Sequence, residues 1–249
     1  ISRKSDGRLP SVHCPTGMFT SLAVKNPIIA ALDVSEAEEA IKLAEAIAPA
    51  VGAFKIGKEL FVSAGPDIVK RVRDTGASVF LDLKFHDIPN TVAKAVASAV
   101  RLDVQMLTVH ASGGTAMLKA AVQAAGDGPL VLGVTVLTSM DESDLAEVGL
   151  QKSPADQVTH LAQLATKAGL KGLVCSPKEI APLREVLPRE VQLVTPGIRP
   201  AGSDTGDQKR VMTPADAIGA GANWLVIGRP IYGADNPRAA AEGILESLD

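Results

Sequence analysis

The sequence predicts an α/β protein folded as a single (β/α)8 TIM barrel, and three observations support this fold class. Short apolar runs rich in β-branched residues recur about every 20 to 30 residues. Most of these runs are separated by alanine-rich stretches with helical spacing. The length of 249 residues, with 46% hydrophobic content, suits one barrel domain with a large core.

Eight apolar runs are expected to form the strands. In chain order they span residues 28–34, 53–56, 79–85, 104–109, 130–137, 172–175, 192–195 and 224–227. The clearest helical stretches between them span residues 36–48, 91–100, 155–168 and 237–248. Most runs are apolar without strict alternation, which is typical of parallel strands covered on both faces, and eight strand-helix units indicate a closed barrel. A doubly wound open sheet is the alternative.

The barrel domain is expected to span residues 18–249, because no linker or second boundary follows residue 20. Residues 1–17 carry scattered charge, Pro10 and Pro15 and lack an apolar core, so they do not resemble a secretory signal. We expect them to be a disordered extension or a remnant of expression.

Composition narrows the class of partner. A net charge of −3, 3% aromatic residues and the absence of a Lys/Arg cluster argue against binding to nucleic acid or to an anionic membrane. No apolar run approaches the roughly 20 residues that a membrane span needs. Cys14 and Cys175 are too few for a disulfide framework, which fits a reducing cytosol. We therefore expect a cytoplasmic protein with a small-molecule partner.

Polar side chains collect where the expected strands end. In a (β/α)8 barrel those ends lie together at one face, where the active site forms. The residues concerned are Asp33, Lys55, Asp82, Lys84, His110, Thr138, Ser139, Ser176, Arg199 and Arg229. We expect one pocket there, with His110 and Ser176 as pocket walls or structural groups.

The third run places charged residues inside the barrel. Strand side chains alternate between faces, so Asp82 and Lys84 share the inward face with Phe80, and the other face carries Leu81, Leu83 and Phe85. An unpaired charge in the interior costs several kcal/mol. Asp82 and Lys84 therefore form either a structural ion pair or part of a catalytic site.

The last two expected strands indicate a phosphorylated ligand. Residues 195–199 and 227–230 place glycines and arginines where barrels bind phosphate through backbone amides and guanidinium groups. Residues 200–210 form a polar stretch with glycines that is suited to a lid over the ligand. Ordinary turns are the alternative explanation for each glycine.

These motifs together resemble orotidine 5′-monophosphate decarboxylase of the bacterial type. The resemblance runs from about residue 26 to 249 and rests on residues 31–33, 54–59, 82–91, 136–140, 194–200 and 226–230. It implies a homodimeric (β/α)8 barrel without metal or organic cofactor. It also implies conversion of orotidine 5′-monophosphate to uridine 5′-monophosphate and carbon dioxide in de novo pyrimidine biosynthesis.

The resemblance implies a catalytic array of Lys55, Asp82 and Lys84, completed by Asp87 from the neighbouring subunit. Asp82 would face the substrate carboxylate, and two like charges about 4 Å apart repel by roughly 4 kcal/mol at an effective dielectric near 20. Lys84 would stabilise the anion at pyrimidine C6 and then protonate it. Its flanking carboxylates favour the charged ammonium form.

The remaining contacts also follow from the resemblance. Asp33 and Lys55 would hold ribose hydroxyls, and Thr138 would contact the substrate near the pyrimidine. Ile88 and Thr91 would enter from the partner subunit with Asp87, for which helix N-capping is an alternative. The phosphate or its lid would be bound by Gln208, Arg229, the Gly228 amide and Arg199.

Two other functions fit parts of the pattern. One is a metal-dependent barrel enzyme such as a 3-keto-gulonate 6-phosphate decarboxylase or hexulose-phosphate synthase, although Lys55 stands where a Mg²⁺ site would favour an acid. The other is a barrel that binds a phosphorylated ligand without catalysis, which leaves Lys84 between two acids without a purpose.

Overall fold

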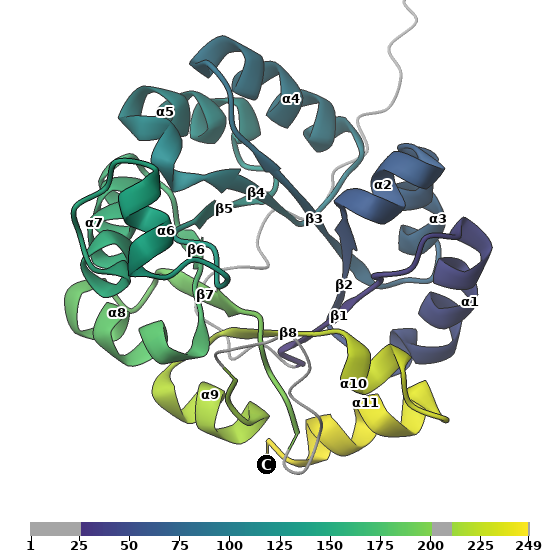
Figure 1. Ribbon diagram of the computed structural model, residues 1–249. Helices are drawn as coiled ribbons and strands as arrows, with labels where there is room; N and C mark the ends of the chain where they lie inside the picture. The colour runs from purple at the N-terminus through teal and green to yellow at the C-terminus, as the bar shows by residue number, and fades with distance from the viewer. Residues whose placement is uncertain (1–25, 201–210, 249) are drawn as a thin grey trace, which may run out of the picture.

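A computed structural model describes residues 26–200 and 211–248. Its strands form a closed barrel in the order of the sequence, with every neighbouring pair parallel and β8 pairing with β1 (Figure 1). The strands are β1 (Ile28–Ala31), β2 (Ala53–Gly57), β3 (Ser78–Phe85), β4 (Met106–His110), β5 (Leu130–Val134), β6 (Gly172–Val174), β7 (Gln192–Thr195) and β8 (Trp224–Ile227). The predicted (β/α)8 barrel is therefore confirmed and the open sheet is wrong. The extension expected at residues 1–17 lies outside the described residues.

Helices surround the barrel as an outer ring (Figure 1). The α-helices are α1 (Ala37–Ile47), α2 (Lys58–Ala64), α3 (Asp67–Arg73), α4 (Pro89–Arg101), α5 (Gly114–Ala125), α6 (Glu142–Glu147), α7 (Pro154–Lys167), α8 (Ile180–Val186), α9 (Pro214–Ala220), α10 (Arg229–Tyr232) and α11 (Pro237–Glu246). Short 3₁₀ turns occur at Ala48–Ala50, Ala111–Gly113 and Pro177–Glu179. Ser153, Thr213 and Asn236 cap α7, α9 and α11, each accepting a hydrogen bond from a backbone amide of the first turn.

Four expected strands extend beyond the strands of the structure. β1 ends at Ala31, β5 ends at Val134, β6 ends at Val174, and β4 begins at Met106. Several apolar residues beyond these ends are still buried, such as Leu32 at 0% and Val136 at 7% exposed, and the Leu32 amide still donates to the Lys55 carbonyl oxygen over 3.0 Å. An apolar run therefore predicts burial more reliably than it predicts the end of a ladder.

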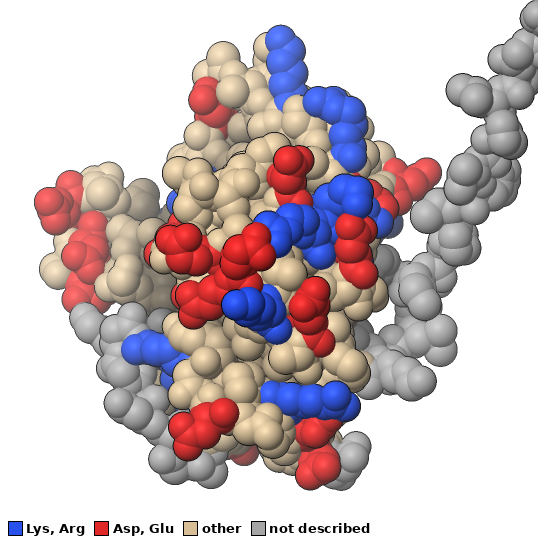
Figure 2. Space-filling view, turned by 90° about the vertical axis from the view of Figure 1, so that its right-hand side faces the viewer, with Lys and Arg blue, Asp and Glu red and all other residues tan. Residues whose placement is uncertain are grey.

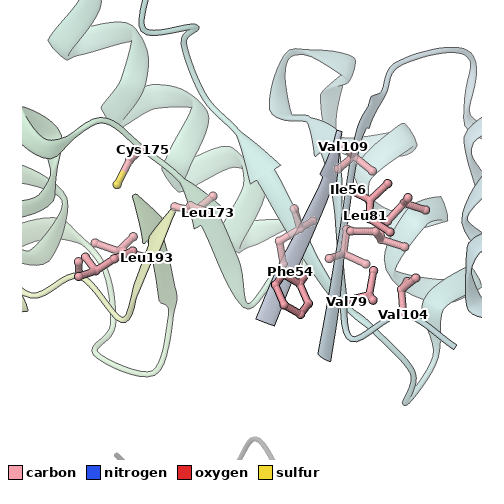
Figure 3. Close-up of a cluster of buried hydrophobic side chains, with 14 of the residues drawn as sticks. Phe54, Ile56, Val79, Leu81, Val104, Val109, Leu173, Cys175 and Leu193 are labelled. Carbon is pink, nitrogen blue, oxygen red and sulfur yellow. The ribbon is translucent and has the colours of Figure 1, made fainter. Parts of the chain in front are cut away.

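The core has two layers, because each strand buries both of its faces. The outer layer lies between the strands and the helices, and Figure 3 shows part of it, with Phe54, Ile56, Val79 and Leu81 on one side and Leu173 and Leu193 on the other. The inner layer fills the barrel with Ile29, Ala31, Ala53, Phe80, Met106, Leu132, Val194, Trp224 and Val226. The barrel interior is therefore a packed core, as is usual for this fold.

The interior changes from apolar to polar toward the carboxyl ends of the strands. Residues two apart on a strand share a face. Ala53 is followed on the inward face of β2 by Lys55, and Phe80 is followed on β3 by Asp82. On β4, Met106 is followed by Thr108. This periodicity places polar groups at the barrel mouth, above the apolar inner layer.

The outer surface around α1 and α3 carries mixed charge. Figure 2 shows Lys and Arg interspersed with Asp and Glu across this face, without a single-sign patch. Ion pairs there join Lys70 to Asp74 and Arg71 to Glu38. No helix in the described ranges is long and apolar enough to cross a membrane.

Candidate active site

A register shift in β3 positions the central lysine. Leu81 on β3 pairs with Leu107 on β4, but Phe85, four residues later, pairs with Val109, only two residues later on β4. Lys84 lies within this bulge and has a φ of 53°, in the left-handed region. That conformation costs a non-glycine residue on the order of 1–2 kcal/mol, and strain of this kind is concentrated at functional sites. Sequence alternation predicted the inward direction of Lys84 correctly but not this distortion of the strand.

Lys84 forms a close ion pair with Asp82. The Lys84 Nζ lies 2.8 Å from both carboxylate oxygens, and the hydroxyl of Thr108 donates a further hydrogen bond of 2.9 Å to Asp82 Oδ1. Burial raises the pKa of Asp82, but the ammonium groups of Lys84 and Lys55 and the two sets of hydrogen bonds outweigh burial and hold the pKa below its ordinary value. Asp82 is therefore ionised at neutral pH although its side chain is only 12% exposed.

A second ion pair adjoins the first. Lys55 Nζ on β2 donates to Asp33 Oδ1, just beyond β1, over 2.8 Å. Asp33, Lys55, Asp82 and Lys84 thus form a row of alternating charge across three consecutive strands, called here the charged array. Gly57 lies against this array, because a Cβ at that position would stand 3.1 Å from Lys55 Nζ. A larger residue at position 57 would press on the ammonium group.

The segment expected to serve a partner subunit lies at the surface. Asp87, Ile88 and Thr91 are all exposed at the start of α4, and the Ile88 side chain is 66% exposed. The capping alternative for Asp87 is wrong, because Ile88 occupies the N-cap position and no side chain caps the helix. Asp87 Oδ1 instead accepts a hydrogen bond from the Ile88 backbone amide over 2.6 Å. Among the described residues, Asp87 makes no hydrogen bond or ion pair with a member of the charged array.

The residues expected to bind phosphate follow β7 and β8. Arg199 is 8% exposed, and its Nη1 donates to the Ile198 carbonyl oxygen over 2.9 Å. Gly228 directly precedes α10, whose first residue is the exposed Arg229. Gln208 and most of the expected lid lie outside the described residues. Thr138, expected near the pyrimidine, is partly exposed beyond the end of β5.

Two other polar residues at the strand ends have structural neighbours. The His110 ring at the end of β4 lies 5.5 Å, centroid to centroid, from the ring of His86. Burial, the His86 ring and the ammonium groups of Lys84 and Lys58 lower the pKa of His110. Ser176 is fully buried, and its backbone amide donates to Glu179 Oε2 over 2.8 Å. The Ser176 hydroxyl oxygen itself is buried without a hydrogen-bond partner in the part of the chain that the structure describes, and the wall or structural roles expected for His110 and Ser176 stay predictions.

Sequence reasoning missed three residues of the site: Thr108, Gly57 and Tyr232. The ring of Tyr232 would lie 3.3 Å from a Cβ on Gly228, and burial and the nearby Asp33 carboxylate raise the pKa of Tyr232. For Thr108 a signal was present, since it lies two residues before His110 on the same face of the fourth run. For Tyr232 and Gly57 the sequence contained no such signal, because their places in the site depend on contacts with other strands.

Known proteins are similar to this chain over most of its length. The family described as orotidine 5′-phosphate decarboxylase / HUMPS matches residues 26–244. The orotidine 5′-phosphate decarboxylase of Vibrio parahaemolyticus is 51% identical over 90% of this chain and 98% of that protein, and the Pasteurella multocida enzyme is 52% identical over 89% and 97%. The crystal structure of the Lactobacillus acidophilus enzyme superposes with a TM-score of 0.81 at 37% identity, over 90% of this chain and all of that one. The chain therefore belongs to the orotidine 5′-phosphate decarboxylase / HUMPS family.

Proposed function

We propose that this chain is an orotidine 5′-phosphate decarboxylase, a carboxy-lyase of pyrimidine biosynthesis that forms uridine 5′-monophosphate and carbon dioxide. The observation that carries the proposal is the charged array at the barrel mouth, in which Lys84 is held 2.8 Å from Asp82. Membership of the family and about 50% identity to decarboxylases over most of the chain support it.

The reaction breaks the bond between pyrimidine C6 and its carboxylate carbon. Asp82 faces that carboxylate and repels it, and the repulsion is relieved as neutral carbon dioxide leaves. The electron pair of the broken bond stays on C6, where the ammonium of Lys84 stabilises it and then donates a proton to the carbon. Solvent returns a proton to Lys84, and no oxidant or reductant is needed.

Preorganisation is the main contribution of the protein to this step. The ammonium of Lys84 is fixed by two hydrogen bonds to Asp82, and Lys55 is fixed by Asp33, before any substrate binds. Charges held in place in this way stabilise a developing anion without reorganising during the reaction. The alternating signs keep each lysine beside a carboxylate, so no member of the array is an isolated charge.

Substrate binding uses the rest of the mouth. Asp33 and Lys55 hold the ribose hydroxyls, and Thr138 contacts the pyrimidine side. The phosphate is bound by Arg199, Arg229, the Gly228 amide and Gln208. Binding energy from the remote phosphate contributes to closing the site around the reacting carbon.

A homodimer completes each site with the partner subunit's Asp87, Ile88 and Thr91. An apolar groove supports this assembly, because Leu83 and Phe85 on the outer face of β3 line it together with Phe61 of α2 and residues of α4. Ile88 at the start of α4 and Val62 on α2 add apolar surface, with exposed fractions of 66% and 81%. A second copy of the chain would cover this surface and bring Asp87 to the neighbouring mouth.

The activity is tested by following the loss of orotidine 5′-monophosphate absorbance. Wild-type protein is expected to turn over, and Lys84→Ala is expected to lose at least about 10³-fold in kcat, since it removes both the proton donor and the electrostatic stabilisation. Lys70→Ala is the matched control, because Lys70 is 76% exposed on α3 and distant from the array. Binding of the nucleotide without turnover by wild type would instead favour a non-catalytic binding barrel.

Complementation tests the shared site. Lys84→Ala and Asp87→Ala proteins are each expected to be inactive, and a statistical mixture of exchanged subunits should regain about a quarter of wild-type activity, one intact site per heterodimer. Heterodimer formation is verified separately with tagged subunits. Proven exchange without recovered activity would remove Asp87 from the partner's site while leaving the decarboxylase assay unaffected.

A metal-dependent reaction is the second candidate, since the family also carries the name HUMPS. The two carboxylates of the array are each paired with a lysine at 2.8 Å, so cationic side chains stand where a Mg²⁺ ion would otherwise bind. Among residues 26–200 and 211–248, no group of three or more His, Cys, Asp or Glu side chains is arranged around a common metal position. Full activity after dialysis against a strong chelator is expected, and activity that returns only on adding Mg²⁺ would favour the second candidate.

A further inference from the structure

We propose that Thr108 is a positioning residue of the decarboxylase site, whose hydroxyl holds both the backbone of Lys84 and the carboxylate of Asp82 in their working geometry. The inference rests on the proposed function, because the groups that Thr108 holds are those assigned to the reaction. It follows from two hydrogen bonds made by one buried oxygen. Thr108 Oγ1 accepts from the Lys84 backbone amide over 2.9 Å and donates to Asp82 Oδ1 over 2.9 Å.

The position of Thr108 opposite the bulge explains why a side chain is needed there. Regular pairing between β3 and β4 is interrupted between Leu81 and Phe85, so the Lys84 amide lies outside the regular ladder. A partly buried backbone donor that has lost its place in the ladder needs another acceptor, and Thr108 Oγ1 supplies it from the facing strand. The hydroxyl thus replaces a ladder bond and supports the left-handed conformation of Lys84.

The same hydroxyl fixes the orientation of Asp82. A hydroxyl has one hydrogen to donate, and here it points to Oδ1 because an ionised carboxylate oxygen can only accept, while the Lys84 amide donates to Oγ1. The carboxylate then presents both oxygens to Lys84 Nζ at 2.8 Å. The Lys84 backbone amide and the Asp82 carboxylate, which must keep fixed relative positions during the reaction, are therefore both tied to one side chain.

Burial argues that this hydroxyl is retained for its contacts. Thr108 is 1% exposed, and its neighbours on β4 are the apolar residues Leu107 and Val109. Valine has nearly the same shape and would bury no polar atom, so packing alone favours valine. The threonine is suited to this position only if both hydrogen bonds are made.

The test compares Thr108→Val, Thr108→Ser and wild type with orotidine 5′-monophosphate as substrate. Thr108→Val is expected to lower kcat about 10- to 100-fold with KM changed less than about threefold, because the reacting groups shift while the substrate contacts remain. Thr108→Ser keeps the hydroxyl and should recover to within about threefold of wild-type kcat. Equal kcat values for Thr108→Val and wild type, or a serine variant as slow as the valine variant, would overturn the proposal.

A matched control separates positioning from simple loss of stability. Thr135 is another buried threonine, 4% exposed, whose Oγ1 donates to the Val174 carbonyl oxygen over 3.2 Å and does not touch the charged array. Thr135→Val removes a comparable hydroxyl and should leave kcat within about threefold of wild type. A fall in kcat for Thr135→Val as large as that for Thr108→Val would show that both effects come from weakened packing.

A second readout needs no turnover. Asp82 has a lowered pKa in the folded state, so its contribution to stability is present above the unfolded pKa and is lost as the pH falls through the folded one. Thr108→Val removes one hydrogen bond to the charged carboxylate, so the stability lost between about pH 7 and pH 3 should be smaller than in wild type. An unchanged acid dependence would overturn the role of Thr108, whereas absence of wild-type turnover would overturn only the proposed function.

Discussion

Replacing Asp82 by Asn should show how much the ion pair between Asp82 and Lys84 contributes to the stability of the fold. Asp82 accepts two hydrogen bonds of 2.8 Å from Lys84 and one of 2.9 Å from Thr108. Asparagine keeps the shape but loses the charge, and its amide nitrogen would face either an ammonium group or a hydroxyl donor. The relevant quantity is the coupling free energy between positions 82 and 84, obtained from Asp82→Asn, Lys84→Met and the double variant.

The magnitude follows from the geometry and burial of the pair. Opposite charges 2.8 Å apart attract by roughly 6 kcal/mol at an effective dielectric of 20, and the cost of desolvation offsets part of this. The side chains are 12% exposed for Asp82 and 25% exposed for Lys84, so solvent screens the pair only partly. We expect Asp82→Asn to destabilise the fold by about 2–4 kcal/mol and the coupling free energy to be about 2–3 kcal/mol.

Urea denaturation at pH 7 measures the coupling, and the chain provides its own control. Lys70 and Asp74 are an ion pair of the same residue types at 2.6 Å on α3, but their side chains are 76% and 62% exposed. The corresponding cycle, Lys70→Met with Asp74→Asn, should give about 0.5 kcal/mol or less, and added salt should reduce it. A coupling at positions 82 and 84 no larger than that of the control would refute the argument that burial strengthens the array.

Three further predictions concern neighbouring groups. Gly57→Ala would place a Cβ 3.1 Å from Lys55 Nζ, and the φ of −86° at this position allows alanine without backbone strain. We expect kcat/KM to fall about tenfold in steady-state assays while the free energy of unfolding changes by less than about 1 kcal/mol. An unchanged kcat/KM would contradict this. His110 has a lowered pKa in the folded state, so the unfolded chain binds a proton more readily and wild-type stability should fall as the pH drops below about 6.5. Urea denaturation at pH 7 and pH 5 should show a smaller fall in stability for His110→Gln than for wild type. Equal falls would argue against this role of His110. Cys175 is buried, and burial raises the pKa of its thiol to about 12. In a Cys14→Ser background, a thiol reagent should therefore label Cys175 only after the protein unfolds. Stoichiometric labelling of the folded protein would disprove this.

The sequence by itself determined the barrel and the inward direction of the charged residues on β3. Apolar runs separated by helical stretches indicate eight parallel strand-helix units, because buried strands and amphipathic helices have different periods. Alternation along β3 placed Asp82 and Lys84 on the inward face, and both lie there at 2.8 Å from one another. Local periodicity carries this information, since the side-chain direction on a strand depends only on position within that strand.

Only the tertiary structure decided which groups pair between neighbouring strands at the mouth. The contact of Lys55 with Asp33 depends on the register between β1 and β2, and the contacts of Thr108 depend on the interrupted register between β3 and β4. Sequence periodicity specifies a face but neither the register with a neighbouring strand nor the backbone angles of a bulge. The left-handed φ of 53° at Lys84 and the threonine that supports it arise from that register, because strand pairing is set by contacts between residues distant in the sequence.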